Sequence, residues 1–303
     1  MSDKFSLIDA EKADPKSEFT VTLMCTVLGV SSSGFYDWRA AAPCPRAVRR
    51  ALVAAAVQVA FDAGRGTYGV RRVARVLGRS ADPQVNTASI KLVRSVMREL
   101  DLHACQRRAY RTTTRRDPNA EPGIVDQVRR EFTASEPGVK FVGDITYVPT
   151  WQGWLYLATV IDCHNKAVVG WSMADHMRTS LICDAITMAA GNVELAAGAI
   201  FHSDRGTQYT STQFAAHLKA LGMTGSMGQT GVCWDNALAE SFFAALKNEL
   251  VHRTVFPTRE RARRAIAEYI EVFYNRQRLH SGLGYKTPLE VSLQHQQDRS
   301  IAA

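Results

Sequence analysis

The spacing of apolar positions predicts a series of helices over the first hundred residues. Residues 19–28 are largely apolar and end at Gly29, and the serines at 31–33 offer N-caps for a second short helix through Trp38. Together they form a helix-turn-helix-like unit, a motif that is also common as a simple packing corner. Longer helices with one apolar face are expected over residues 45–63, 70–77 and about 89–100, and Thr87 or Ser89 could cap the last of them.

Beyond residue 123 the pattern changes to strands alternating with helices. Turn-like residues separate the first three strand-like runs, which predicts an antiparallel meander. The expected strands cover 140–148, 154–162, 167–173, 199–204 and 223–227, and the expected helices cover 124–134, 179–192, 211–221, 236–251 and 258–276. The fold class is therefore α/β, a mixed sheet with helices on both faces, preceded by an all-α region. This element order is that of the ribonuclease-H-like fold.

Positive charge is concentrated in the N-terminal part of the chain. The net charge is +8, yet residues 1–116 hold 20 Lys and Arg against 10 Asp and Glu, and residues 43–116 hold 16 against 4. A nearly neutral body that carries a basic region indicates binding to a polyanion such as nucleic acid. A solvated, arginine-rich helical surface is the alternative interpretation.

The basic side chains fall into three groups that could contact DNA. Lys91, Arg94 and Arg98 are spaced by three and four residues, so they share one stripe of a helix. Such a stripe suits a DNA groove or backbone, but a helix that is simply solvated on that side explains it equally well. The other candidates are Arg71, Arg72 and Arg75 in the 70–77 helix, and Arg107 and Arg108 in a proline-containing basic linker at 105–122.

Cysteine usage and hydropathy indicate the cellular compartment of the protein. The six cysteines form no C-x-x-C pair, which favours free thiols in a reducing compartment over disulfides or a zinc site. No apolar run is long enough to span a bilayer, and the N-terminus lacks the pattern of a signal peptide. A cytoplasmic protein without membrane contact is expected.

Two aspartates occupy positions that suggest chemistry. Asp144 lies inside a strand, where Asp is unfavourable, on the face opposite Phe141, Gly143 and Ile145. Asp204 ends the next long strand, and the carboxyl ends of strands are where open α/β sheets place ligands. If these strands are neighbours, the two carboxylates approach each other; the alternative for Asp144 is a bulge or an edge position.

A third carboxylate, Glu240, opens a predicted helix after Asp235 or Asn236 as N-cap, with Lys247 two turns further on the same face. An ordinary exposed helix pair would give the same spacing. Converging carboxylates repel one another unless a pKa rises or a cation lies between them. Oxygen ligands without His or Cys favour Mg²⁺ or Mn²⁺, and two such ions can promote phosphoryl transfer.

The intervals and local sequences resemble a known family. The 35 residues between Asp204 and Glu240, with Lys247 seven residues later, resemble the D,D-35-E signature of retroviral integrases and insertion-sequence transposases. The resemblance extends from about residue 6 to 292 through SLIDAEKA, MCTVLGVSSSGFYDWR, GDITYV, HSDRGTQYTS, SMGQTGVCWDNALAESFFAALKNEL and FYNRQRLHSGLGYKTPLE. The chain is similar to the orfB-type transposases of bacterial insertion elements; Leu238, where relatives often have Pro, is one small departure.

This resemblance implies a DNA transposase that cleaves and joins strands at the ends of its element. It implies that Asp144, Asp204 and Glu240 hold two metal ions and that Lys247 contacts DNA near the cleaved end. It implies double-stranded DNA as partner, self-association on DNA and possible fusion to an upstream orfA-type protein. It also implies a bacterial protein that is associated with the nucleoid. His202 is expected to be a packing residue or to support a ligand. The pattern of Tyr274, Asn275, Arg278 and His280 is expected to be structural or to face DNA, and the structural role is favoured.

The expected organisation has five parts: residues 1–42, a helix-turn-helix-like segment; 43–104, a basic DNA-binding module; 105–122, the linker; 123–292, the catalytic core; and 293–303, a tail. Three other functions compete with this interpretation. A ribonuclease-H-type nuclease would only hydrolyse, a DNA-binding regulator would use residues 19–116 alone, and a merely basic protein would need no carboxylates at these intervals.

Overall fold

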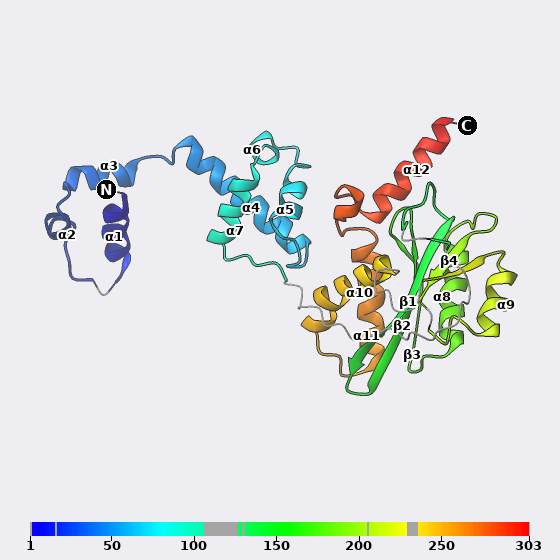
Figure 1. The fold of residues 1–303 in the computed structure, drawn as a ribbon. Helices are drawn as coiled ribbons and strands as arrows, with labels where there is room; N and C mark the ends of the chain where they lie inside the picture. Colours follow the sequence, from blue (N-terminus) through cyan, green and yellow to red (C-terminus); the bar gives the residue numbers. More distant parts are fainter. Residues whose placement is uncertain are drawn as a thin grey trace.

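The computed structural model describes residues 2–15, 17–105, 127–128, 131–204, 206–228 and 236–302. Figure 1 shows three successive parts, two of them helical and the third built on a sheet. The N-terminal unit contains α1 (Ser2–Ala13), α2 (Val21–Leu28) and α3 (Ser32–Ala40). The helical module contains α4 (Pro45–Ala63), α5 (Val70–Leu77), α6 (Pro83–Asn86) and α7 (Ile90–Glu99).

The N-terminal unit has its own small core and the capping expected from its sequence. The Ser31 hydroxyl accepts a hydrogen bond from the Gly34 amide and starts α3. Gly29 ends α2 in the left-handed conformation at φ 62°, which suits a residue without Cβ. Phe5 and Phe35 are buried together. The helix-turn-helix-like pair is therefore confirmed, and α1, which the pattern did not predict, completes its packing.

The helical module buries one face of each helix and exposes the other. The buried residues are Val53, Val57 and Ala60 of α4, Val73 and Leu77 of α5, and Val93, Val96 and Met97 of α7. Ser89 caps α7, as the sequence predicts, by accepting from the Leu92 amide. Inward packing of these apolar residues leaves the basic stripe of α7 facing solvent.

Within the described residues, five strands form one mixed sheet in the order β3-β2-β1-β4-β5. The strands are β1 (Lys140–Thr150), β2 (Gly153–Asp162), β3 (Val168–Ala174), β4 (Ile200–Ser203) and β5 (Thr224–Met227). The first three are antiparallel, which confirms the predicted meander, while β4 is parallel to β1 and β5 is parallel to β4. This arrangement places β1 at the centre of the sheet, beside β4.

Helices cover both faces of the sheet, which confirms the ribonuclease-H-like fold class. One face packs Phe141 and Phe201 under α8 (Thr179–Asn192) and α9 (Thr212–Ala220). The other packs Val142 and Val148 under α10 (Ala237–Glu249) and α11 (Arg259–Glu268). Since strand residues alternate between faces, Asp144 lies on the α10 side.

The C-terminal region differs from the sequence expectation. After α11 the helix widens into a π-helical turn at Tyr269–Tyr274, and residues expected as a tail belong to α12 (Pro288–Ala302), which extends away from the sheet (Figure 1). Short 3₁₀ turns cover Val251–Arg253 and Ser281–Leu283. Except for residue 105, the expected linker at 105–122 lies outside the described residues. Of the expected helix at 124–134, residues 127–128 and 131–134 are described and are not helical, so this prediction was wrong for them.

The helical module packs directly on the core. The Tyr68 hydroxyl donates to the Gln277 carbonyl and accepts from the Leu279 amide, both at 2.9 Å. Arg65 forms an ion pair with Glu268 of α11. These contacts hold α5 and the turn before it against the C-terminal part of the chain. In the described part of the chain, no helix has the length and apolarity needed to cross a membrane.

Candidate active site

Asp144 and Asp204 occupy equivalent positions on neighbouring parallel strands. Val142 of β1 pairs with His202 of β4, and each aspartate follows two residues later. Gly143 allows this close approach, because a Cβ at that position would overlap the Phe201 ring. The predicted neighbouring of the two strands is thus confirmed, and both aspartates lie toward the carboxyl ends of β1 and β4.

The two aspartates are held by their own backbone surroundings. Asp144 is half-buried, and its Oδ1 accepts from the Ile145 amide at 2.7 Å. Asp204 is exposed, and its Oδ1 accepts from the Gly206 amide at 3.0 Å in an Asx-type turn. Each carboxylate keeps one oxygen free of these local bonds.

Glu240 lies in the first turn of α10, as predicted. Asn236 precedes the helix, and its carbonyl accepts from the Glu240 amide at 3.1 Å. The Asn236 side-chain amide donates to the Gly143 carbonyl at 3.1 Å. This hydrogen bond fixes the start of α10 to the strand residue next to Asp144, a role that could have been suspected only from the capping position of Asn236.

Electrostatics connect the three carboxylates. Burial and then the negative charges of Asp204 and Glu240 raise the pKa of Asp144 to about 7, against an opposing effect of Lys247. Partial burial raises the pKa of Glu240. The three acidic groups are therefore near enough to influence one another electrostatically. As they stand, no three His, Cys, Asp or Glu side chains among the described residues are close enough together to hold a metal ion.

Lys247 lies near these acidic groups, two turns after Glu240. Its Nζ is 5.2 Å from the centroid of the Tyr147 ring, and its charge counteracts the raised pKa of Asp144. Burial lowers the pKa of Lys247. The predicted common face of Glu240 and Lys247 is consistent with this placement.

Tyr209 is a residue of this site that sequence reasoning did not single out. It is 3% exposed and packs against Phe201 and Phe214. Its buried hydroxyl has no hydrogen-bond partner within the described part of the chain. Burial and the charges of Asp144 and Asp204 raise its phenol pKa, so the hydroxyl lies near both aspartates. The only signal in the sequence was a polar aromatic five residues after Asp204.

His202 and two residues of the C-terminal pattern make structural contacts. His202 is buried, and its Nδ1 lies 2.9 Å from the Ser226 hydroxyl. Arg278 donates twice to Glu249, at 2.6 and 2.7 Å, and Asn275 bonds the backbone of Val168 through both ends of its amide. Asn275 and Arg278 thus connect the C-terminal region to the sheet and to α10.

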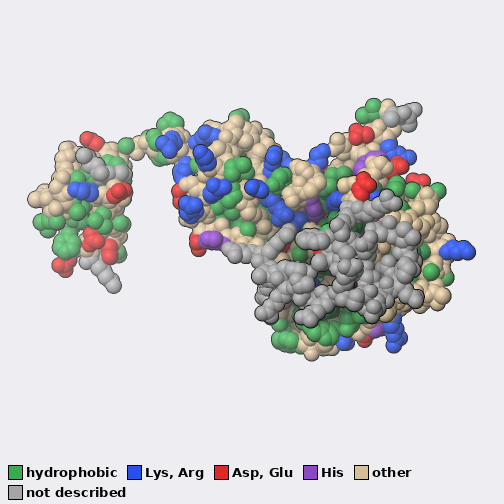
Figure 2. Space-filling view, in the orientation of Figure 1, with side chains coloured by type: hydrophobic (Ala, Val, Ile, Leu, Met, Phe, Trp, Pro, Cys, Tyr) green, Lys and Arg blue, Asp and Glu red, His purple; other side chains and the backbone are tan. Residues whose placement is uncertain are grey.

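The candidate DNA-binding side chains are divided between surface and interior. Those on the surface of the helical module are Arg71, Arg75, Lys91, Arg94 and Arg98. Figure 2 shows Lys and Arg side chains gathered over this module. Arg72 is instead largely enclosed, 5.6 Å from the centroid of the Tyr68 ring and 3.9 Å from Glu249. Arg107 and Arg108 lie outside the described residues.

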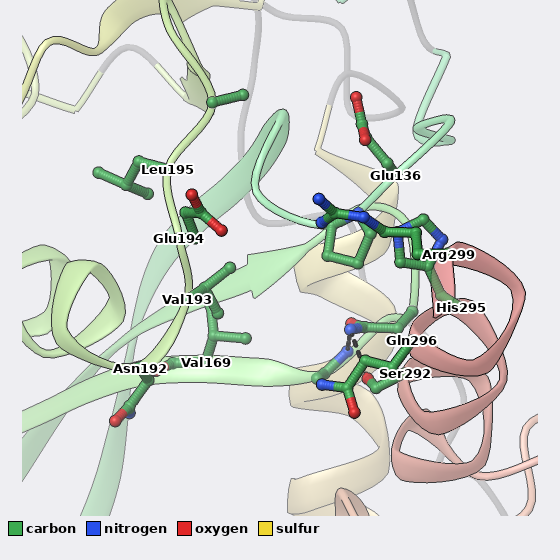
Figure 3. A pocket seen from close by; sticks show the side chains of 14 residues that line it. Glu136, Val169, Asn192, Val193, Glu194, Leu195, Ser292, His295, Gln296 and Arg299 are labelled. Atoms are coloured by element: carbon green, nitrogen blue, oxygen red, sulfur yellow. Dashed lines mark hydrogen bonds between the residues drawn. The ribbon is translucent and has the colours of Figure 1, made fainter. Parts of the chain in front are cut away.

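Two further features do not belong to this site. The described cysteines, Cys25, Cys44, Cys105, Cys163 and Cys183, are free thiols, as predicted. A cavity of about 500 Å³ separates α12 from the segment before β4 (Figure 3), where His295 and Arg299 face Glu136 and Glu194. The cavity lies near the amino ends of β1 and β4, whereas the aspartates lie toward the carboxyl ends of these strands.

Comparison with known proteins identifies the family. An HTH-like domain model matches residues 48–110, and two integrase core domain models match residues 134–233 and 221–288. The transposase InsF of insertion sequence IS3A from Escherichia coli K12 is 38% identical over 280 residues, covering 90% of this chain and 94% of that protein. The chain belongs to the IS3-family transposases.

A second transposase relative agrees with this membership. The transposase of insertion sequence element IS904 from Lactococcus lactis is 36% identical over 248 residues, covering 81% of this chain and 95% of that protein. The solved catalytic core of HTLV-2 integrase, in complex with magnesium, is 17% identical and covers 52% of this chain and 98% of that chain, with a TM-score of 0.40. The fold assignment rests on the family models and the observed strand order.

The transposase thus combines a DNA-binding part and an integrase core. The helical module coincides with the HTH-like match, and the sheet with its flanking helices coincides with the integrase matches. Asp144 and Asp204 fall in the first integrase match and Glu240 in the second. The predictions of fold class, transposase function and DNA binding are confirmed at this level.

Proposed function

We propose that Asp144, Asp204 and Glu240 are the catalytic residues with which the transposase cleaves its element's ends and joins them to target DNA. One observation carries the proposal: Asp144 and Asp204 each follow two residues after the paired Val142 and His202 on neighbouring parallel strands, and burial together with the charges of Asp204 and Glu240 raises the pKa of Asp144. Three acidic groups from separate parts of the integrase core therefore repel one another in one place. Repulsion of this kind is typical of sites that a cation completes.

The donor set fits Mg²⁺ or Mn²⁺. Carboxylate oxygens are the ligands that these ions prefer, and the buried Tyr209 hydroxyl offers a further polar contact beside Asp144 and Asp204. A pair of such ions would supply Lewis-acid activation of the attacking oxygen and stabilise the leaving oxygen. The proposal requires the three carboxylates to draw closer together when the ions bind, with Glu240 moving on the first turn of α10.

The chain's own residues have distinct tasks in this proposal. Asn236 holds the start of α10 against β1 and so keeps Glu240 near Asp144. Lys247 provides a positive charge for a DNA phosphate next to the carboxylates. The arginines and lysines on the surface of the helical module, with Arg107 and Arg108, bind the phosphate backbone and position the element end.

The proposed assembly follows from the substrate. A linear element has two ends, and each chain supplies one set of three carboxylates, so we propose self-association on DNA. Fusion to an upstream orfA-type partner would add recognition of the ends, and binding to chromosomal DNA would keep the transposase at the nucleoid. The division of the chain at residues 105–122 remains our proposed domain boundary.

The test is a cleavage and strand-transfer assay on labelled element ends with Mg²⁺ or Mn²⁺. Asp144→Asn should lower both reactions by at least about a hundred-fold, because it removes a charged ligand from the site. DNA affinity should stay close to wild type, since the basic module positions the DNA. Asp184→Asn, an exposed carboxylate on α8, is the matched control and should react normally.

Three outcomes contradict the proposal. Full activity of Asp144→Asn would exclude the carboxylate from catalysis. Joint loss of cleavage and DNA binding in a folded Asp144→Asn protein would indicate a binding role instead. Hydrolysis without any joined product in the wild type would favour a nuclease.

A further inference from the structure

A second polar cavity lies where the helical module meets the core. Its volume is about 150 Å³, several times the roughly 30 Å³ that a water molecule occupies in the liquid. Arg72 comes from α5, Lys166 from the turn between β2 and β3, and Arg278 from the C-terminal region. Ser241 of α10 and Ser281 complete the polar lining. Four separate segments of the chain therefore converge on this point.

The cavity has an excess of positive charge. None of the residues that line it within the described chain is acidic. The neighbouring Glu249 is occupied by a bidentate bond with Arg278 and is 3.9 Å from Arg72. Lys166 donates to the carbonyls of Phe132 and Cys163, which do not neutralise it. Burial lowers the pKa of Arg72 and Lys166, and the charge of Arg278 adds to this effect on Arg72.

Several hydrogen-bonding groups in the cavity have no acceptor or donor among the described residues. Arg72 makes an ion contact but no hydrogen bond, and Nη1 of Arg278 is unused. The Nε2 atom of His280 is buried and has no partner among the described residues, but the other ring nitrogen donates to the Tyr274 backbone, so Nε2 of a neutral His280 is an acceptor and supplies no donor for an anion. Burial and the charges of Arg278, Arg72 and Lys166 lower the pKa of His280 to about 3, so it is neutral at physiological pH and the three cations face it. The cavity is therefore lined for an anion with several oxygens.

We propose that this interdomain anion pocket binds a backbone phosphate of the element's DNA. The proposal rests on the proposed function, because DNA is the polyanion that the transposase must hold. Arginine forks and hydroxyl donors match the several oxygens of a phosphate better than a single carboxylate. Ser241 directly follows Glu240 on α10, so a phosphate bound here contacts the helix that carries the third catalytic carboxylate while it also contacts the DNA-binding module.

The experiment measures affinity for a short duplex carrying the end of the element that encodes this chain, over a range of salt concentrations and in EDTA. Arg72→Gln should weaken binding by about ten- to a hundred-fold. It should also reduce the slope of log K against log salt by about 0.9, the value for one phosphate contact. Arg264→Gln is the control, since it removes an equal charge from a highly exposed side chain of α11.

A second variant keeps the test valid if loss of Arg72 disturbs packing. Ser281→Asp places a negative charge at the exposed rim of the pocket and should weaken binding similarly, whereas Ser300→Asp on α12 should not. Binding and salt slopes of Arg72→Gln and Ser281→Asp equal to those of their controls would overturn the proposal. Because EDTA removes the metal, this result is independent of the carboxylates: Asp144→Asn should keep the wild-type slope, and its cleavage defect tests the proposed function separately.

Discussion

At the scale of the residue, Asp144 is an acidic group in an environment far from that of water. It is half-buried on the central strand, and it faces the charges of Asp204 and Glu240. Its folded pKa of about 7, against an ordinary value of 3.8, means that folding favours the protonated carboxyl. Ionised Asp144 is thus a local source of instability that a bound cation would relieve.

This environment predicts a pH-dependent stability. A raised carboxyl pKa makes the metal-free protein lose stability as pH rises from about 4 through about 7. Asp144→Asn removes that loss, so its melting temperature should exceed that of wild type by at least about 2–4 °C at about pH 8, corresponding to roughly 1 kcal/mol. The difference should shrink at about pH 5. Thermal unfolding in EDTA measures it, and a gap that grows on acidification would contradict the account.

Saturating Mn²⁺ provides the control for this prediction. It should stabilise wild type much more than Asp144→Asn, because only wild type keeps all three charged ligands. Asp184→Asn should follow wild type with and without the ion.

At the scale of the element, the site depends on the close approach of β1 and β4 and on the anchored start of α10. Gly143 contributes to both features. Its lack of a Cβ leaves room for the Phe201 ring, and its carbonyl accepts a hydrogen bond from the side-chain amide of Asn236. The strand pairing therefore sets the positions of both aspartates, and the helix start sets that of Glu240.

Gly143→Ala tests this arrangement. The added Cβ collides with an aromatic ring in a packed core, which should cost about 1–3 kcal/mol of unfolding free energy and lower cleavage activity. Gly191→Ala is the control, because nothing lies within 4 Å of a Cβ there and a helical Ala should stabilise by about 0.5–1 kcal/mol. Urea denaturation compares the two variants; equal stability of Gly143→Ala and wild type would disprove the tight strand approach.

The sequence predicted these elements well because their patterns are local. The alternation around Asp144 gave the correct face of β1, and the serine caps gave the starts of α3 and α7. Tyr209 could not be predicted to be a site residue, since its proximity to both aspartates depends on how α9 and β4 pack. The enclosure of Arg72 was missed for a related reason: amphipathic spacing shows which side of α5 is polar, but not that the core covers part of it.

At the scale of the whole molecule, the DNA-binding module and the catalytic core share contacts. The Tyr68 hydroxyl lies between Gln277 and Leu279, and Arg65 pairs with Glu268. These contacts therefore hold the module in a fixed position on the core. DNA bound by the module could then enter the active site of the core in a defined register.

Tyr68→Phe should weaken the contact between the helical module and the core. It leaves the buried Leu279 amide without its acceptor, at a cost of about 1–3 kcal/mol. Unfolding should shift to lower denaturant, and cleavage should fall more than DNA affinity does, because binding and chemistry lose their alignment. Tyr36→Phe, on an exposed tyrosine of α3, should change stability by less than about 0.5 kcal/mol. An unchanged midpoint for Tyr68→Phe would argue against the docking.

The central claim is that three carboxylates form one metal site. Its most direct test is a crystal of the transposase soaked with Mn²⁺ and measured at the manganese absorption edge. The account predicts anomalous peaks bound by oxygens of Asp144, Asp204 and Glu240 together, with two ions when DNA is present. Manganese found elsewhere, or held without one of these three residues, would contradict it.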